Sequence, residues 1–167
     1  MQIDASDLAN LAIKNAKHGE EIACLVTSIN RKMVRFSNGE FTVSQAWDET
    51  ETAILYKKEG KTAVGSTLSV SAEAVITLLE KLRASVGSIK PKQDFSKLAK
   101  EMPSAPTPTS PVYDSPDELL ADIVIRADSA AMNSGAERSA VVLNSERYTW
   151  NLSTTTGIDV SSSSTSN

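Results

Sequence analysis

The residue types best suited to metal binding or nucleophilic catalysis are scarce, because this chain of 167 residues has one histidine and one cysteine. A zinc site needs several ligands, as in the motif His-Glu-x-x-His, and His18 with Cys24 cannot supply them. A Ser–His–Asp triad is disfavoured because His18 is expected at a helix end. No glycine-rich phosphate-binding loop is present. The sequence therefore predicts no catalytic, cofactor-binding or metal-binding residue in this chain.

Two other groups could carry chemistry: the thiol of Cys24 and the carboxylates of Asp48, Glu49 and Glu51. Cys24 lies in an apolar run with no base nearby in the sequence, so we expect a small buried hydrophobe rather than a nucleophile. Paired carboxylates can act as general acid and base, but a cluster at the end of an expected strand is typical of a solvated turn. A small enzyme that uses Cys24 is the least favoured hypothesis.

Three residues are candidates for contact with a partner. Arg35, on the outer face of an expected hairpin, could solubilise the strand or bind a partner's carboxylate. Trp47 and Trp150 are expected in the core, but either would become an interface anchor if it were exposed at a strand edge. Arg35, Trp47 and Trp150 are therefore the predicted interface residues.

Composition limits the partners. The formal net charge of −4 argues against a general nucleic-acid binder. Four lysines of the connector described below indicate a solvated face rather than a nucleic-acid patch; they are Lys90, Lys92, Lys97 and Lys100. The start M-Q-I-D-A-S-D-L does not resemble a signal peptide, and no apolar run is long enough for a membrane span. With a single cysteine, the sequence predicts a soluble, cytoplasmic protein that binds neither nucleic acid nor membrane.

The stretch Lys32–Trp47 predicts a hairpin that organises the chain. Asn38-Gly39 suits a type I′ turn, in which both central residues have φ > 0. A two-residue loop there pairs Phe36 with Phe41. The apolar residues that then share one face, as a half-buried ribbon requires, are Val34, Phe36, Phe41 and Val43.

Further elements surround this hairpin. A helix is expected over 4–17, capped by Asp4 or Ser6 and closed by Gly19. Its apolar stripe comprises Leu8, Leu11, Ala12 and Ala16. A strand over 21–29 is apolar on both faces, which predicts that both faces are covered.

After the hairpin, we expect strands over 52–57 and 61–68 and a helix over 71–86 that ends at Gly87. Its expected stripe is Val75, Leu78, Leu79, Leu82 and Val86. All six prolines of the chain then fall between Pro91 and Pro116, which predicts a long connector over the surface.

Ser115 and Glu118 form a capping box for a helix that ends at Gly135. Its expected stripe comprises Leu120, Ile123, Val124, Ala127 and Ala131. Strands are expected over 139–144, over 147–153 and over 157–162. In the second of these, the residues predicted to point inward are Tyr148, Trp150 and Leu152. The serine-rich end has no packing content and predicts a frayed terminus.

Segregated helices and antiparallel strands predict an α+β fold, a two-layer sandwich in which a strand meander packs against helices. We expect three parts. Residues 1–87 hold a helix, the meander and a helix, residues 88–114 form the Pro-rich connector, and residues 115–167 complete the same domain.

The ordered set of segments resembles the N-terminal domain of the TldD/PmbA family, also called modulators of DNA gyrase. The matching pieces are the helix with Leu8 and Leu11, V-R-F-S-N-G-E-F at 34–41, K-K-E-G-K-T-A-V-G-S-T at 57–67 and V-L-N-S-E-R-Y at 142–148. The resemblance covers nearly the whole chain. Within the family, the stretch F-T-V-S-Q-A-W looks more like the non-catalytic, PmbA-like branch.

The resemblance implies a metallopeptidase family whose active members carry a zinc motif, His-Glu-x-x-x-His, downstream of this domain, so no cofactor is expected here. It also implies dimers of similar subunits that degrade unfolded peptides, in which this domain helps to enclose the chamber. The function expected for this chain is non-catalytic: subunit assembly and the enclosure or admission of unfolded peptide, possibly at a strand edge. The alternative is a free-standing adaptor domain that binds a protein partner.

Overall fold

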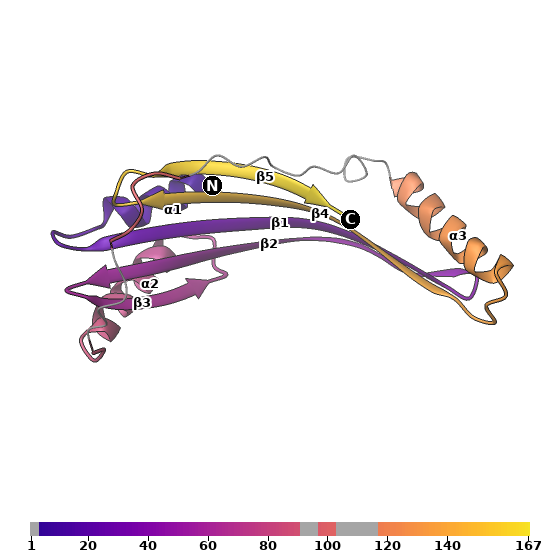
Figure 1. Cartoon of the computed structure of the whole chain (residues 1–167), viewed down its shortest axis with the longest axis horizontal. Coiled ribbons are helices and arrows are strands. Elements are labelled where there is room, and N and C mark those ends of the chain that lie inside the picture. The colour runs from indigo at the N-terminus through magenta and orange to yellow at the C-terminus, as the bar shows by residue number, and fades with distance from the viewer. Residues whose placement is uncertain (1–3, 91–96, 103–116) are drawn as a thin grey trace. The chain divides into compact units, whose positions relative to one another are not determined.

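The computed structural model describes residues 4–90, 97–102 and 117–167, and this part of the chain holds three helices and a five-stranded antiparallel sheet (Figure 1). The elements in chain order are α1 (Ala5–Lys14), β1 (Glu21–Ser37), β2 (Glu40–Lys58), β3 (Lys61–Thr67), α2 (Ala72–Val86), α3 (Asp117–Asn133), β4 (Ala140–Thr154) and β5 (Asp159–Ser166). The strand order is β3-β2-β1-β4-β5. The predicted α+β class is confirmed. Most of the predicted connector, and Ser115 of the predicted capping box, lie outside the described residues.

The chain divides into two compact units. The first unit draws on Met1–Ser28, Glu49–Pro106 and Thr149–Ser162, and the hairpin unit draws on Ile29–Asp48, Thr107–Tyr148 and Ser163–Asn167. Strands β1, β2, β4 and β5 contribute residues to both units.

The core of the first unit lies between one face of the sheet and the helices α1 and α2. Its buried members are Leu8, Ala9, Ala12, Ile22, Cys24, Val26, Ile54, Tyr56, Ala63, Val75, Leu79, Leu82 and Val86. Most are aliphatic, as the low aromatic content predicts. Burial of each large aliphatic side chain stabilises the fold by about 1.5–3 kcal/mol.

Helix α1 is shorter than predicted. It begins after Asp4, whose side chain makes no capping hydrogen bond, and its last helical residue is Lys14. Asp4 therefore holds the predicted N-cap position without the capping bond, whereas Ser6 lies inside the helix and is not the cap. Gly19 has a φ of 78° in the turn that follows, so it shapes the turn and not the helix end. His18 is exposed in the same turn.

Helix α2 follows the prediction closely. The Ser71 hydroxyl accepts a hydrogen bond from the Ala74 N–H at 3.1 Å, which caps the start. The helix ends at Val86, directly before Gly87. Helix α2 packs tightly on β3 at Gly65, where an added Cβ would lie 3.1 Å from Cδ1 of Leu78.

Strands β1 and β2 are longer than predicted, at 17 and 19 residues. The breaks predicted between 29 and 32 and between 47 and 52 do not occur. Neither interval contains glycine or proline, and polar side chains are accommodated in a strand that faces solvent. Asp48, Glu49 and Glu51 are exposed within β2, so the prediction of a turn there was wrong.

The predicted turn of the β1–β2 hairpin is confirmed. Asn38 and Gly39 have φ values of 52° and 83°, as a type I′ turn requires. The Phe36 and Phe41 rings meet edge to face with centroids 4.9 Å apart, which confirms their pairing. Only the β1 side of the ribbon is fully buried, because Val34 and Phe36 are each 7% exposed while Phe41 is 49% exposed.

Helix α3 packs on β1 within the hairpin unit. Val34 and Phe36 pack against Leu120 and Val124 of α3, and half-buried residues of β4 complete this small core; they are Val141 and Leu143. Ala127 was predicted to be buried but is exposed. The third buried position of the helix face is Asp128. Gly135, with a φ of 93°, follows the end of the helix as predicted.

The serine-rich end is a strand and not a frayed terminus. It forms β5, which pairs with β4 through a short loop that contains Gly157 with a φ of 97°. The Ser153 hydroxyl donates to the Asp159 carboxylate at 3.0 Å, and the Ser145 hydroxyl donates to the Asn167 side chain at 2.9 Å. Such side-chain bonds stabilise the pairing of the two strands.

Candidate interaction surface

Tyr148, Trp150 and Leu152 do not point toward the buried core, so their predicted direction was wrong. The Thr155 N–H donates to the Ile22 carbonyl at 2.9 Å, and counting from that pair places Ser153 opposite Cys24 and Leu152 opposite Leu25. Ser153 is 2% exposed on the helix-covered face. Its hydroxyl can be buried because Asp159 satisfies it.

The other face of the sheet in the first unit carries apolar side chains that no described helix covers. We call this surface the open face; it comprises Leu25, Leu55, Val64, Trp150 and Leu152. Leu55 and Val64 are cross-strand partners. Leu25 of β1 is 37% exposed, so the prediction that both faces of β1 are covered was wrong. Val64 of β3 is 68% exposed. Exposed apolar surface of this kind is typical of interaction sites.

A described piece of the predicted connector attaches at one end of the open face. The Leu98 N–H donates to the Glu21 carboxylate at 3.0 Å, and the Thr156 hydroxyl donates to the Ala99 carbonyl at 2.6 Å. The same Glu21 carboxylate pairs with Lys57 at 3.7 Å. This end of the face is therefore occupied by polar contacts within the chain.

Trp47 lies in a polar cluster of the hairpin unit. The Arg31 guanidinium carbon is 5.3 Å from the centre of the Trp47 ring, in a cation–π contact. Arg31 also pairs with Glu146, whose second oxygen accepts from the Tyr148 hydroxyl. These four side chains are half-buried and come from the neighbouring strands β2, β1 and β4. Trp47 is therefore half-buried in a polar cluster instead of packed in the core, and its role at an interface stays a prediction.

The hydrogen bonds of this cluster stabilise its charges. The bond to Glu146 raises the pKa of Arg31, and the bond from Tyr148 lowers the pKa of Glu146. The bond to Glu146 likewise raises the pKa of Tyr148. The cluster thus keeps its ion pair at neutral pH.

The three predicted interface residues occupy different settings. Arg35 is exposed on β1 of the hairpin unit, where both its predicted roles stay open. Trp47 lies in the same unit, and its ring contacts the Arg31 guanidinium. Trp150 is half-buried on the open face of the first unit.

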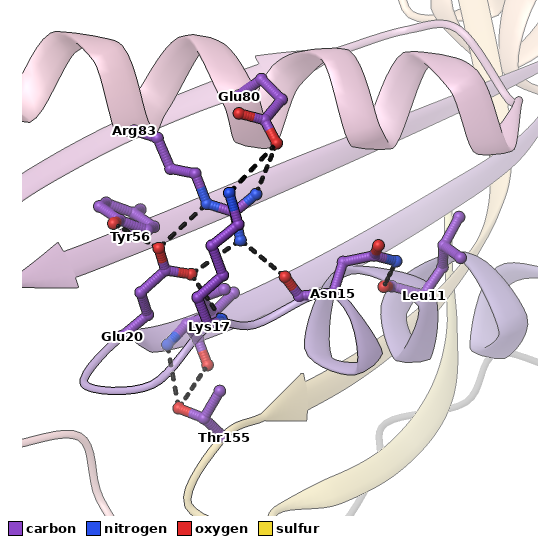
Figure 2. A network of polar contacts seen from close by, with 9 residues as sticks. Leu11, Asn15, Lys17, Glu20, Tyr56, Glu80, Arg83 and Thr155 are labelled. Atoms are coloured by element: carbon purple, nitrogen blue, oxygen red, sulfur yellow. Dashed lines mark hydrogen bonds and ion pairs between the residues drawn. The ribbon is translucent and has the colours of Figure 1, made fainter.

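A second polar network in the first unit was not predicted (Figure 2). Nε and Nη2 of Arg83 donate to the two carboxylate oxygens of Glu20 at 3.0 and 2.8 Å. The Tyr56 hydroxyl and the Lys17 N–H also donate to Glu20, at 2.9 and 2.8 Å. Arg83 further donates to the Asn15 carbonyl at 2.6 Å. The network joins α2, β2 and the turn before β1.

Glu20 is almost completely enclosed, with a side chain 1% exposed. Burial alone would raise the pKa of Glu20, but the donors Arg83, Lys17 and Tyr56 outweigh it and hold the pKa at about 2. Burial, helped by the bond to Glu20, raises the pKa of Tyr56 to about 12. Both carboxylate oxygens of Glu20 accept hydrogen bonds from other parts of the chain. Glu20 therefore acts as a structural clamp between α2, β2 and the turn before β1.

The described residues offer little for catalysis. Burial raises the pKa of the Cys24 thiol to about 12, so the thiol stays protonated and is a poor nucleophile. No group of three or more His, Cys, Asp or Glu residues that could hold a metal ion occurs in the described ranges. No helix in the described part of the chain has the length and apolar content needed to cross a membrane.

Neither a family model nor a curated protein sequence matches this chain. Solved structures do. One, described as a modulator of a DNA gyrase from Thermotoga maritima, has 21% identity and a TM-score of 0.71, and the match covers 95% of this chain and 36% of that one. TldE from Thermococcus kodakarensis has 13% identity and a TM-score of 0.76 over 95% of this chain and 36% of its own.

A third structure, described as a modulator of DNA gyrase from Bacteroides thetaiotaomicron, has 13% identity and a TM-score of 0.72 over 99% of this chain and 40% of its own. This chain therefore spans 36–40% of the length of these three proteins. The predicted resemblance is thus confirmed at the level of structure: the chain has the fold of the N-terminal part of TldD/TldE-type proteins.

Proposed function

We propose that this chain is the non-catalytic N-terminal domain of a TldD/PmbA-like peptidase, and that it serves subunit assembly and the admission of unfolded peptide. The observation that carries the proposal is the structural match, which takes in 95–99% of this chain but 36–40% of the longer proteins. The zinc chemistry and the peptide hydrolysis would then belong to the rest of such a protein.

The exposed edge of β3 suits the admission of an extended peptide. In the described residues β3 is the outer strand, and it turns from β2 through Glu59-Gly60. A two-residue turn makes Lys58 and Lys61 a hydrogen-bonded pair, and the two kinds of pair alternate along the ladder. Thr62, one pair further on, and Val64, three pairs further on, are therefore in non-hydrogen-bonded pairs. The N–H and C=O groups of Val64 therefore point outward, where an added strand could pair with them.

Assembly has a second candidate in the open face, which shares Val64 with the β3 edge. It carries exposed Leu25 and Val64 together with the half-buried Trp150, and tryptophan is among the residue types most enriched in binding hot spots. A homologous subunit, in a homodimer or a heterodimer, is the partner that the proposal implies.

The test uses the protein encoded by the complete gene, expressed with and without its homologous subunit. Light scattering measures the assembly, and cleavage of a fluorescent unfolded peptide measures activity. Val64→Pro removes one outward N–H and leaves the β2–β3 ladder bonds in place, so we expect slower cleavage in an intact complex. Val64→Thr keeps the N–H and is the matched control.

The outcomes separate the two hypotheses. Equal cleavage by Val64→Pro and Val64→Thr would remove the β3 edge from the proposal. A chain that neither joins a homologous subunit nor affects cleavage would favour the alternative, a free-standing adaptor domain.

A further inference from the structure

Asp128 occupies a position where an apolar residue is expected. It follows Leu120 and Val124 at intervals of four residues, so it continues the buried stripe of α3. Asp128 is 8% exposed, whereas its helical neighbours Ala127 and Ser129 are exposed. A buried carboxylate is costly unless a positive charge or several hydrogen-bond donors compensate it.

No described residue supplies that compensation. The Oδ1 atom of Asp128 is buried and has no hydrogen-bond partner among the described residues. The carboxylate also lies near the C-terminal end of α3, the negative end of the helix dipole, and the last turn of α3 contains no basic residue. Burial, charge and dipole therefore all favour a cation at this point.

Asp128 lines a hollow of about 410 Å³ in the hairpin unit. The other lining residues come from the β1–β2 turn, the end of α3 and the loop before β4; they are Asn38, Gly39, Met132, Glu137, Arg138 and Ser139. Glu137 adds a second carboxylate, and it is exposed. Met132 is 44% exposed, and its flexible side chain can move aside to admit a group to Asp128.

An organic cation suits the hollow better than a metal ion. No cluster of three potential metal ligands exists in the described residues, and the hollow has room for a whole side chain. Guanidinium and ammonium groups bring several N–H donors, as a buried carboxylate requires.

We propose that this hollow binds the cationic side chain, arginine or lysine, of a peptide, with Asp128 as its carboxylate partner. The identity of the ligand as a peptide rests on the proposed function; the cation preference rests on Asp128 alone. The rival occupant is the exposed Arg138 of the chain itself.

The test is an NMR titration of this chain with N-acetyl-arginine amide and, separately, with the neutral isostere N-acetyl-citrulline amide. We expect the arginine derivative, and N-acetyl-lysine amide titrated in the same way, to shift the amide signals of Gly39 and Ser139, and the citrulline derivative to leave them unchanged. Asp128→Asn should weaken binding at least about tenfold. The matched control is Asp122→Asn, which makes the same change at an exposed position of the same helix. This variant should bind the arginine derivative as tightly as the parent chain does.

Several results would overturn the proposal. These are equal shifts with arginine and citrulline, unchanged affinity in Asp128→Asn, or no response up to about 10 mM. Equally strong binding of alanine amide would assign the site to chain ends instead of side chains. A response seen only in Arg138→Gln would show that Arg138 fills the hollow. Because the titration needs no second subunit and no cleavage, its failure is distinct from failure of the assembly test.

Discussion

Arg83 clamps Glu20 through two parallel hydrogen bonds of 3.0 and 2.8 Å, although the two residues lie 63 positions apart in the chain. The pair connects α2 to the turn between α1 and β1. Both side chains are mostly enclosed, at 12% and 1% exposure. The stability of the first unit should therefore depend strongly on this contact.

We expect Glu20→Gln to lower the free energy of unfolding by about 3–5 kcal/mol, because it leaves the Arg83 charge enclosed without its partner. Urea denaturation followed by circular dichroism measures the change. Glu80→Gln is the control, since Glu80 pairs with the same Arg83 at 2.8 Å but is 56% exposed. The control should lose about 1 kcal/mol or less, and an equal loss in both variants would contradict the clamp.

The same carboxylate predicts a dependence of stability on pH. The pKa of Glu20 falls from an ordinary 4.5 to about 2 on folding, so the unfolded chain binds a proton that the folded chain does not. The stabilisation is complete above the unfolded pKa and is lost as the pH falls from about 5 to about 2, by about 3 kcal/mol. Denaturation at several pH values should show this loss in the parent chain. The free energy of unfolding should depend less steeply on pH in Glu20→Gln than in the parent chain. An equally steep dependence in both would assign the loss of stability to other groups.

The cation–π contact in the hairpin unit predicts a fluorescence change. In a Trp150→Phe background, emission reports on Trp47 alone. Arg31→Gln removes the guanidinium 5.3 Å from the ring, so acrylamide should quench Trp47 more strongly. Arg35→Gln changes an exposed arginine of the same strand and should leave quenching unchanged. Equal quenching in all three proteins would exclude a lasting Arg31–Trp47 contact.

Gly65 predicts a packing defect on substitution. A Cβ there would lie 3.1 Å from Cδ1 of Leu78 and 3.3 Å from Cδ2 of Leu82, so α2 or its leucines must shift. We expect Gly65→Ala to lower the free energy of unfolding by about 1–3 kcal/mol. Ser66→Ala on the same strand should change it by about 0.5 kcal/mol or less. A more stable Gly65→Ala variant would mean that the leucines adjust freely.

The buried Asp128 predicts a gain in stability. Asp128→Leu would continue the stripe of Leu120 and Val124 and remove an unpaired polar atom, so we expect about 1–3 kcal/mol more stability without ligand. Thermal unfolding measures the shift. A destabilised variant would indicate that the carboxylate already has a compensating partner in the folded chain.

Features set by neighbouring residues were predictable from the sequence. Asn38-Gly39 specifies its turn through backbone sterics, and Ser71 specifies the start of α2 through one side-chain bond. The direction of Trp150 was not predictable, because alternation shows that a strand has two different faces but not which one the helices cover.

The candidate sites depend on contacts that the sequence does not encode locally. Nothing near Glu20 points to Arg83, because their pairing follows from the packing of α2 against the sheet. Asp128 could have been found, since it lies four residues after Val124 on the predicted buried stripe. The stripe was instead assigned to Ala127, which is exposed.

The burial of Cys24 has a practical consequence for spectroscopy. The only native thiol is enclosed in the core and stays protonated at neutral pH. A cysteine introduced at an exposed position, such as Ser129 on α3, would therefore react with maleimide reagents far faster than the native one. Spin labels or fluorophores can thus be attached at single chosen positions without first removing Cys24.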